Sequence, residues 1–182
     1  MLLGTDISKW QTDPTTTRRI DFAKMKSNGA NFVFIKSSQA CWQDVDFEYN
    51  WQAAKEAGLP RGAYHYMDWT KPAMEQVQYF AGLLQQDHGE LPPVLDYECR
   101  YNVPHRIVAV QACKVFVEEL EKLVGITPII YTSPSYWNEF GSTDTSWQQY
   151  PLWIANYYVS NPGVPKPWNT WTFWQFSDKG IG

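Results

Sequence analysis

Short apolar runs alternate with amphipathic segments along the whole of this 182-residue chain. The runs have the length of strands, are rich in β-branched and aromatic residues, and are bounded by turn-forming residues. They predict strands over residues 2–7, 31–37, 61–66, 94–97, 127–132, 152–157 and 171–176. In the segments between them, apolar residues recur every three or four positions. This spacing predicts helices over residues 21–28, 47–57, 73–86 and 107–124.

Several predicted helices carry residues that begin or stop a helix. Asp21 is a candidate N-cap for the first one, because its side chain can accept a free backbone N–H of the first turn. Gly29, Gly58 and Gly125 follow helical segments at the position where a residue often adopts the left-handed conformation. These signals support the alternation of strand and helix along the chain.

Strands that alternate with helices predict βα units and a mainly parallel sheet. The sequence contains no G-x-G-x-x-G and no P-loop pattern, which argues against a doubly wound nucleotide-binding sheet. We therefore expect a closed β/α barrel, in which catalytic groups gather at the C-terminal ends of the strands. The length, and the absence of an internal repeat or low-complexity linker, predict one domain over residues 1–182.

Charge and cysteine content narrow the possible partners. The net charge is −4 and the 15 Lys and Arg residues are scattered, so we expect no nucleic-acid partner. Cys41, Cys99 and Cys113 have neither C-x-x-C nor zinc-ligand spacing, so we expect no disulfide framework, no metal and no cofactor. The start of the chain lacks a secretory signal pattern, and no apolar run reaches membrane-spanning length. We expect a soluble monomer.

The most specific chemistry lies where the fourth predicted strand ends in Asp96-Tyr97-Glu98. Because side chains alternate along a strand, Asp96 and Glu98 project to the same face, roughly 6–7 Å apart at the backbone. Two like charges at that distance disfavour double ionisation, and partial burial raises one pKa further. A proton donor beside a carboxylate is the equipment for cleaving a glycosidic bond.

Other predicted strands also end in polar or aromatic residues, which a barrel brings to the same rim. These residues are Asp6, Lys36, His65, Tyr66, Tyr131, Asn156, Tyr157 and Gln175. Their recurrence favours an active site, and the aromatic content of 16% suits stacking on sugar rings as well as core packing. His65 is the exception, because it alternates with Tyr64 and Tyr66 and is expected in the packing layer, hydrogen-bonded and structural.

Seven segments stand out in order along the chain: GTDISKWQ, FVFIKSS, GAYHY, PPVLDYE, PIIYTSPSYW, PLWIANY and WTFWQFS. With the opening D-x-S-x-W-Q and the internal D-x-E, they resemble glycoside hydrolase family 25, the Chalaropsis-type lysozymes of bacteria, fungi and phage endolysins. The resemblance runs essentially from end to end. It implies a flattened, irregular TIM-like β/α barrel. It also implies N-acetylmuramidase activity, which cleaves the β-1,4 bond between N-acetylmuramic acid and N-acetylglucosamine in bacterial peptidoglycan.

The resemblance also implies roles for the residues at the rim. Glu98 resembles the general acid that protonates the leaving oxygen and then acts as the base on water. Asp96 resembles the partner that orients the substrate's 2-acetamido group as the internal nucleophile of a retaining reaction, although the i, i+2 spacing alone leaves direct attack and inversion open. Asp6 tunes the pair through its charge, and Lys36 can pair with Asp6 or bind substrate. The candidate substrate contacts are Lys36, Tyr64, Tyr66, Tyr131, Trp153, Tyr157, Trp174 and Gln175.

One departure from the family lies at the end of the chain. Family members continue past the last strand with a Gly-rich turn and a further acidic residue, whereas this chain stops at Gly182, and Asp178 comes too early to match. We expect either a domain truncated at its C-terminus or a site without one peripheral carboxylate. Phage-type lysis and secretion by another route stay open as the way to the cell wall. A chitinase-like glycosidase and a non-catalytic sugar-binding barrel stay open as alternatives.

Overall fold

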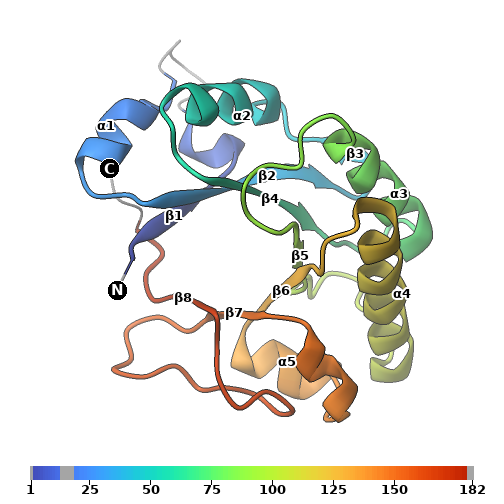
Figure 1. Ribbon diagram of the computed structural model, residues 1–182. Coiled ribbons are helices and arrows are strands. Elements are labelled where there is room, and N and C mark those ends of the chain that lie inside the picture. Colours follow the sequence, from blue (N-terminus) through green and yellow to red (C-terminus); the bar gives the residue numbers. More distant parts are fainter. Residues whose placement is uncertain (1, 13–18, 180–182) are drawn as a thin grey trace.

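The computed structural model describes residues 2–12 and 19–179 and shows a single α/β domain (Figure 1). Within these residues, the curled sheet has eight strands. Seven are parallel and lie side by side in chain order: β1 (Gly4–Ile7), β2 (Phe32–Gln39), β4 (Arg61–Tyr66), β5 (Val94–Asp96), β6 (Ile129–Thr132), β7 (Leu152–Ala155) and β8 (Phe173–Gln175). The short β3 (Trp42–Gln43) pairs antiparallel with β2 and was not predicted. The seven predicted strands are confirmed within a few residues.

The α-helices lie around the outside of the curled sheet (Figure 1). They are α1 (Phe22–Ser27), α2 (Phe47–Glu56), α3 (Ala73–Leu84), α4 (Arg106–Val124) and α5 (Pro134–Phe140). Two 3-10 helices, η1 (Lys9–Gln11) and η2 (Thr145–Gln149), follow β1 and α5. The four predicted helices are confirmed, and α5 is additional. Ser133 caps α5 by accepting the Tyr136 N–H at 3.2 Å, and Pro134 occupies the first helical position. None of the described helices is long and apolar enough to cross a membrane.

Side-chain alternation divides the core into two layers. Ile35, Leu95 and Ile130 point outward and pack, fully buried, against the helices. The inward-facing residues fill the interior of the curl: Phe34, Val94, Ile129, Tyr131, Trp153 and Ala155. The rings of Phe34 and Trp153 lie 4.5 Å apart between centroids. This inner layer forms an apolar floor beneath the C-terminal ends of the strands.

The fold class is confirmed, but the sheet is not closed by strand pairing. Among the described residues, β1 and β8 share no backbone hydrogen bond. Instead, the Gln175 side-chain amide donates to both oxygens of the Asp6 carboxylate, at 2.6 and 3.0 Å. Phe32 and Phe173 also meet edge to face, 5.4 Å apart. Phe32 lies on β2 and Phe173 on β8, so their rings add a second side-chain contact across the seam. Side chains therefore close the barrel where the sequence predicted a closed sheet.

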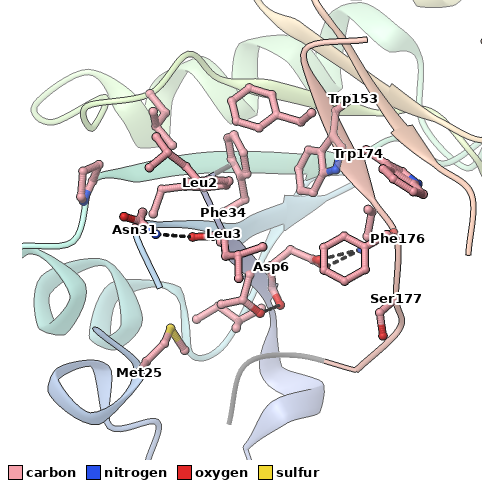
Figure 2. A pocket seen from close by; sticks show the side chains of 18 of the residues that line it. Leu2, Leu3, Asp6, Met25, Asn31, Phe34, Trp153, Trp174, Phe176 and Ser177 are labelled. Atoms are coloured by element: carbon pink, nitrogen blue, oxygen red, sulfur yellow. Dashed lines mark hydrogen bonds between the residues drawn. The ribbon is translucent and has the colours of Figure 1, made fainter. Parts of the chain in front are cut away.

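A cavity of about 970 Å³ follows this open seam. Figure 2 shows Leu2, Leu3 and Phe34 among its apolar lining, with Asp6 also on its wall. Asp6 and Gln175 line both this cavity and the smaller cavity described below. Their hydrogen-bonded pair therefore stands between the apolar seam and the polar rim of the barrel.

Candidate active site

The C-terminal ends of six strands surround a cavity of about 260 Å³. Its lining is rich in carboxylates and aromatic side chains: Asp6, Tyr64, Val94, Asp96, Glu98, Tyr131, Trp153, Tyr157, Gln175 and Asp178. Parallel strands place their C-terminal ends at one edge of a barrel, which explains why residues so far apart in sequence meet here. The structure thus brings together Asp6, Asp96 and Glu98, the three acids that the sequence singles out.

The alternation around Tyr97 sets the direction of the two central acids. Tyr97 is buried on the helix side, where its hydroxyl donates to the Phe140 carbonyl at 2.9 Å and its ring meets Tyr136 edge to face. Asp96 and Glu98, on either side of it, both face the cavity. The predicted projection of Asp96 and Glu98 to one face is confirmed. The packing of Tyr97 against α5 fixes the backbone between the two acids.

Asp96 is an almost completely buried acid without a full set of partners. Asp96 is only 7% exposed, and its Oδ1 has no hydrogen-bond partner among the described residues. Burial, and then the charge of Glu98, raise the pKa of Asp96 well above its usual value, while Lys36 acts in the opposite direction. An acceptor oxygen that is buried and unpaired is costly, and it is available to a donor on a ligand.

Glu98 is half-buried and lies at the open side of the pair. Burial, and then the charge of Asp6, raise its pKa, and the charge of Lys36 opposes them. Burial also raises the pKa of Asp6, although the hydrogen bonds from Gln175 oppose that rise. Burial disfavours the ionised form of all three acids, and the charges of neighbouring acids add to this at Asp96 and Glu98, so this rim holds a proton more readily than isolated carboxyls do.

Gln175 is a positioning residue rather than a free substrate contact. Its amide nitrogen is used by Asp6, and its Oε1 accepts from the Tyr131 hydroxyl at 2.7 Å and from the Tyr157 hydroxyl at 2.6 Å. The amide is therefore saturated by protein groups. The predicted direct substrate contact at Gln175 is not supported by this geometry. The two tyrosine hydroxyls still have lone pairs with which to accept from a ligand.

Lys36 lies next to the cavity and acts on the acids through its charge. A bulge in β2 between Lys36 and Ser38 turns Ser38 outward to His65, whereas Lys36 stays in register with Tyr64. The ammonium group donates to Gln39 Oε1 at 2.9 Å and lies 5.0 Å from the Tyr66 ring centroid. Burial lowers its pKa, and the charge of Asp96 opposes this most strongly. The ion pair with Asp6 that the sequence suggested does not form within the described residues.

The predicted aromatic contacts fall into three groups. Tyr64, Tyr131, Trp153 and Tyr157 line the cavity of the acids. Tyr66 lies beside it, close enough for Asp96 and Glu98 to raise the pKa of its hydroxyl, after the larger effect of burial. Trp174 is not brought to this cavity. It alternates with the inward residue Gln175, and its indole N–H donates to the Asn156 carbonyl at 2.8 Å.

Asp178 also lines the cavity, although the sequence did not predict a role for it there. It follows β8 and lines the cavity opposite the central acids, and its carboxylate accepts from the Tyr158 hydroxyl at 2.6 Å. This hydrogen bond lowers the pKa of Asp178. The signal that could have found it is its place three residues after Gln175, beyond a strand end that already points to the rim.

His65 occupies the structural role that the alternation predicted. It is fully buried, its Nδ1 lies 2.9 Å from Ser38 Oγ and its Nε2 lies 3.1 Å from Gln76 Oε1. Its ring stacks on Phe116, and burial lowers its pKa to about 4. Across residues 2–12 and 19–179, no group of three or more His, Cys, Asp or Glu side chains is arranged to hold a metal ion.

Comparison with known proteins places this geometry in a family. A model of glycosyl hydrolases family 25 matches residues 5–181. The uncharacterized protein YegX of Escherichia coli (strain K12) is 34% identical over 97% of this chain and 63% of YegX. Lysozyme M1 of Streptomyces globisporus is 32% identical over 97% of this chain and 62% of that lysozyme. The chain therefore spans less than two thirds of the length of both relatives.

Solved structures agree with the sequence matches. The structure of a muramidase from Acremonium alcalophilum superposes with a TM-score of 0.85 at 28% identity, over 98% of this chain and 88% of the muramidase. A bacterial lysozyme from Streptomyces coelicolor superposes with a TM-score of 0.83 at 29% identity, over 97% of this chain and 84% of the lysozyme. The curled sheet with its open seam is therefore the irregular TIM-like fold of these enzymes.

Proposed function

The chain belongs to glycosyl hydrolase family 25, and on that premise we propose that it is a muramidase. The reaction is hydrolysis of the β-1,4 bond between N-acetylmuramic acid and N-acetylglucosamine in bacterial peptidoglycan, with retention of configuration. The names of its relatives support this reaction, since Lysozyme M1 and the N,O-diacetylmuramidase of Chalaropsis sp are 32% and 30% identical to it. The cavity of acids and tyrosines at the strand ends supplies the groups that the reaction needs.

Glu98 is the general acid in this proposal. It is half-buried, so it reaches a glycosidic oxygen in the cleft, and its raised pKa keeps a proton available for transfer. After the leaving sugar departs, water attacks the anomeric carbon and displaces the acetamido oxygen described below, and the ionised Glu98 takes the proton of that water. Asp6 contributes by charge alone, because its oxygens are held by Gln175 and its field raises the pKa of Glu98.

The observation that carries the proposal is the unpaired, buried Oδ1 of Asp96. A sugar's 2-acetamido N–H is a donor of the kind this oxygen lacks, and a hydrogen bond there would turn the acetamido oxygen toward the anomeric carbon. The acetamido oxygen would then attack that carbon in place of a protein nucleophile, which is the substrate-assisted form of glycoside hydrolysis. Lys36 limits the repulsion among the three acids while the oxocarbenium-like charge develops.

The site of action is part of the proposal. We expect the enzyme to act on the bacterial cell wall, reached after phage-type lysis or by secretion. Because the matched relatives are longer than this chain, the activity and partners of the whole protein are also proposals.

Three substitutions test the roles of the acids. Glu98→Gln keeps the shape but removes the transferable proton, so lytic activity on Gram-positive walls should fall by about 10²–10⁴. Asp96→Asn should be nearly as damaging, and Asp6→Asn less so, mainly in kcat. Glu118→Gln on α4 is a matched control outside the cavity and should leave activity unchanged. Turbidity loss and reducing-end analysis of the products measure both rate and bond specificity. Wild-type clearing by Glu98→Gln, or Asp6→Asn as the most damaged variant, would show that these roles are wrong.

A second experiment separates assistance by the substrate from attack by the protein. Walls whose muramic acid lacks the N-acetyl group should still bind but resist cleavage, and a thiazoline mimic of the cyclised intermediate should bind more tightly than the parent sugar. Proton NMR should show the β anomer as the first product. A 2-fluoro sugar that leaves a covalent adduct on Asp96, seen by mass spectrometry, would refute assistance, and an inverted anomer would refute retention.

A further inference from the structure

Beside the cavity of acids, η1, β2, β3 and β4 carry aromatic rings that alternate with ammonium groups. The Lys9 Nζ lies 5.1 Å from the ring centroids of both Trp10 and Trp42. The Lys36 Nζ lies 5.6 Å from the Trp42 ring and 5.0 Å from the Tyr66 ring. These side chains form a row in the order Trp10, Lys9, Trp42 and Lys36. Trp10 lies at the exposed end, and the charge of Lys36 at the other end acts on Asp96. We call Lys9, Trp10 and Trp42 the indole platform.

Backbone hydrogen bonds fix the indole platform without using its ammonium group. Ser8 caps η1 by accepting the Trp10 N–H, and the Gln11 side chain accepts the Ser8 N–H at 2.7 Å. The buried Asp44 carboxylate accepts the Lys9 N–H at 3.2 Å, which ties η1 to the loop after β3. The backbone that carries Lys9 and Trp10 is therefore fixed before any ligand arrives, which lowers the entropy cost of binding.

The charge and the rings of the platform lack the partners that a purely structural role would supply. Within the described residues, the Lys9 ammonium forms no ion pair, and Lys36 contacts the neutral amide of Gln39. Trp10 is 77% exposed and Trp42 is 39% exposed, which is unusual for so large an apolar side chain. Exposed indoles next to the Lys9 ammonium, which forms no ion pair within the described residues, make a surface that suits a ligand with an apolar face and an anionic group.

We propose that the indole platform binds an N-acetylmuramic acid unit whose lactyl carboxylate is free. This assignment rests on the muramidase function proposed above. The apolar face of the sugar stacks on an indole, and the lactyl carboxylate, which a short ether link joins to O3 of the ring, meets the Lys9 ammonium beside the same indole. A carboxylate on a stem peptide sits on a flexible chain and is not tied to the stacked ring. Because the net charge of the chain is −4, this recognition depends on short-range contacts.

Binding to defined oligosaccharides tests the assignment. The ligands are a tetrasaccharide of alternating N-acetylglucosamine and N-acetylmuramic acid with free lactyl carboxylates, the same tetrasaccharide with lactyl amides, and the same tetrasaccharide bearing stem peptides. Isothermal titration calorimetry is done on the Glu98→Gln protein, with Lys9→Met, Lys9→Arg and Trp42→Leu added singly. Lys114→Met is the matched control, since Lys114 also lies over a tryptophan, 6.0 Å from the Trp147 ring, but on α4 outside the cleft.

The free carboxylate should bind roughly two- to fivefold more tightly than the amide, and high salt should reduce the difference. Lys9→Met should abolish this preference, whereas Lys9→Arg and Lys114→Met should keep it. Trp42→Leu should weaken the carboxylate and amide ligands alike, by roughly two- to tenfold. Equal binding of carboxylate and amide, or a preference that survives Lys9→Met, would overturn the assignment. Tightest binding of the stem-peptide ligand, lost in Lys9→Met, would also overturn it.

The two proposals fail in different assays. If the muramidase proposal fails, the wild-type protein leaves peptidoglycan glycan uncut, whatever the titrations show. If only the assignment of the indole platform fails, the wild-type protein cleaves peptidoglycan and the carboxylate preference is absent or independent of Lys9. Unchanged thermal midpoints across the Lys9 and Trp42 variants show that losses in affinity come from the platform and not from unfolding.

Discussion

Asp96→Asn should make the protein more stable at neutral pH while it removes most of the activity. In the folded wild type, burial and the charge of Glu98 raise the pKa of Asp96. An acid whose pKa is higher in the folded state than in the unfolded state costs stability at pH values above its unfolded pKa, because folding then requires a buried charge or an extra bound proton. The substitution removes this cost and keeps the size of the side chain.

The unpaired Oδ1 sets the scale of the gain. A buried polar group without a partner costs about 1–3 kcal/mol. Two effects place the gain in the lower part of that range. Asparagine still leaves a polar atom without a partner, and Lys36 loses the acid that acts on it most strongly. We expect a gain of about 1–2 kcal/mol, which for a domain of this size raises Tm by roughly 2–8 °C.

Urea unfolding and thermal melts between pH 3 and pH 8 measure the effect. The advantage of Asp96→Asn should be full at neutral pH and should disappear as the pH falls below the ordinary Asp pKa of 3.8, because the wild-type carboxyl is then protonated in both the folded and the unfolded state. Asp44→Asn is a matched control, because Asp44 is equally buried but its two oxygens accept backbone N–H groups of Lys9 and Asp46. That variant should be less stable than the wild type. An Asp96→Asn protein that is destabilised at neutral pH would refute this account of the acid pair.

Three further predictions concern the charges and the packing around the site. Lys36→Met removes the cation that opposes the raised pKa values of the acids, so the alkaline limb of the kcat/KM profile should move to higher pH; an unmoved limb would contradict the assigned field. Gly62→Ala places a Cβ 2.3 Å from the Phe34 ring and should cost roughly 1–3 kcal/mol in urea unfolding, with a neutral result showing that the inner layer can relax. Arg61→Met should cost roughly 1–3 kcal/mol and should reduce, without removing, the loss of wild-type stability between about pH 4 and pH 2, where Asp87, with a folded pKa of about 2, takes up its proton; Lys55 and the Gly89 N–H also lower that pKa and remain in the variant, and a loss of unchanged size would show that Arg61 does not contribute to it.

The sequence predicted the parallel strands and the meeting of the acids because both follow from local rules. Strand length and alternation place Asp96 and Glu98 on one face, and parallel strands bring Asp6 to the same rim. The helix α5 was missed although Ser133 and Pro134 form a typical helix start. This start signal is local, so the sequence alone was sufficient to predict the helix.

Other features of the site depend on contacts that no local pattern contains. Gln175 and Asp6 are 169 positions apart, and their hydrogen bonds form only once the sheet has curled far enough to bring its edges together. Alternation separates Trp174 from Gln175 but does not tell which of the two faces the interior. The same limit applies to the seam, because the contacts that cross it, such as that of Phe32 with Phe173, join residues far apart in the sequence.

The aromatic interior of the barrel is the physical cause of the chemistry at its rim. Burial is the largest influence on the pKa values of Asp6, Asp96 and Glu98, and at Asp96 and Glu98 it comes ahead of the charges of the neighbouring acids. The layer that buries them is the apolar floor built on Phe34 and Trp153, whose rings lie 4.5 Å apart directly within the curl. Water excluded by this floor cannot solvate the carboxylates from below, so their charged forms are disfavoured and a proton is retained. The aromatic residues that fill the interior of the curled sheet therefore also raise the pKa values of the acids. The same side chains stabilise the fold and set the protonation of the site.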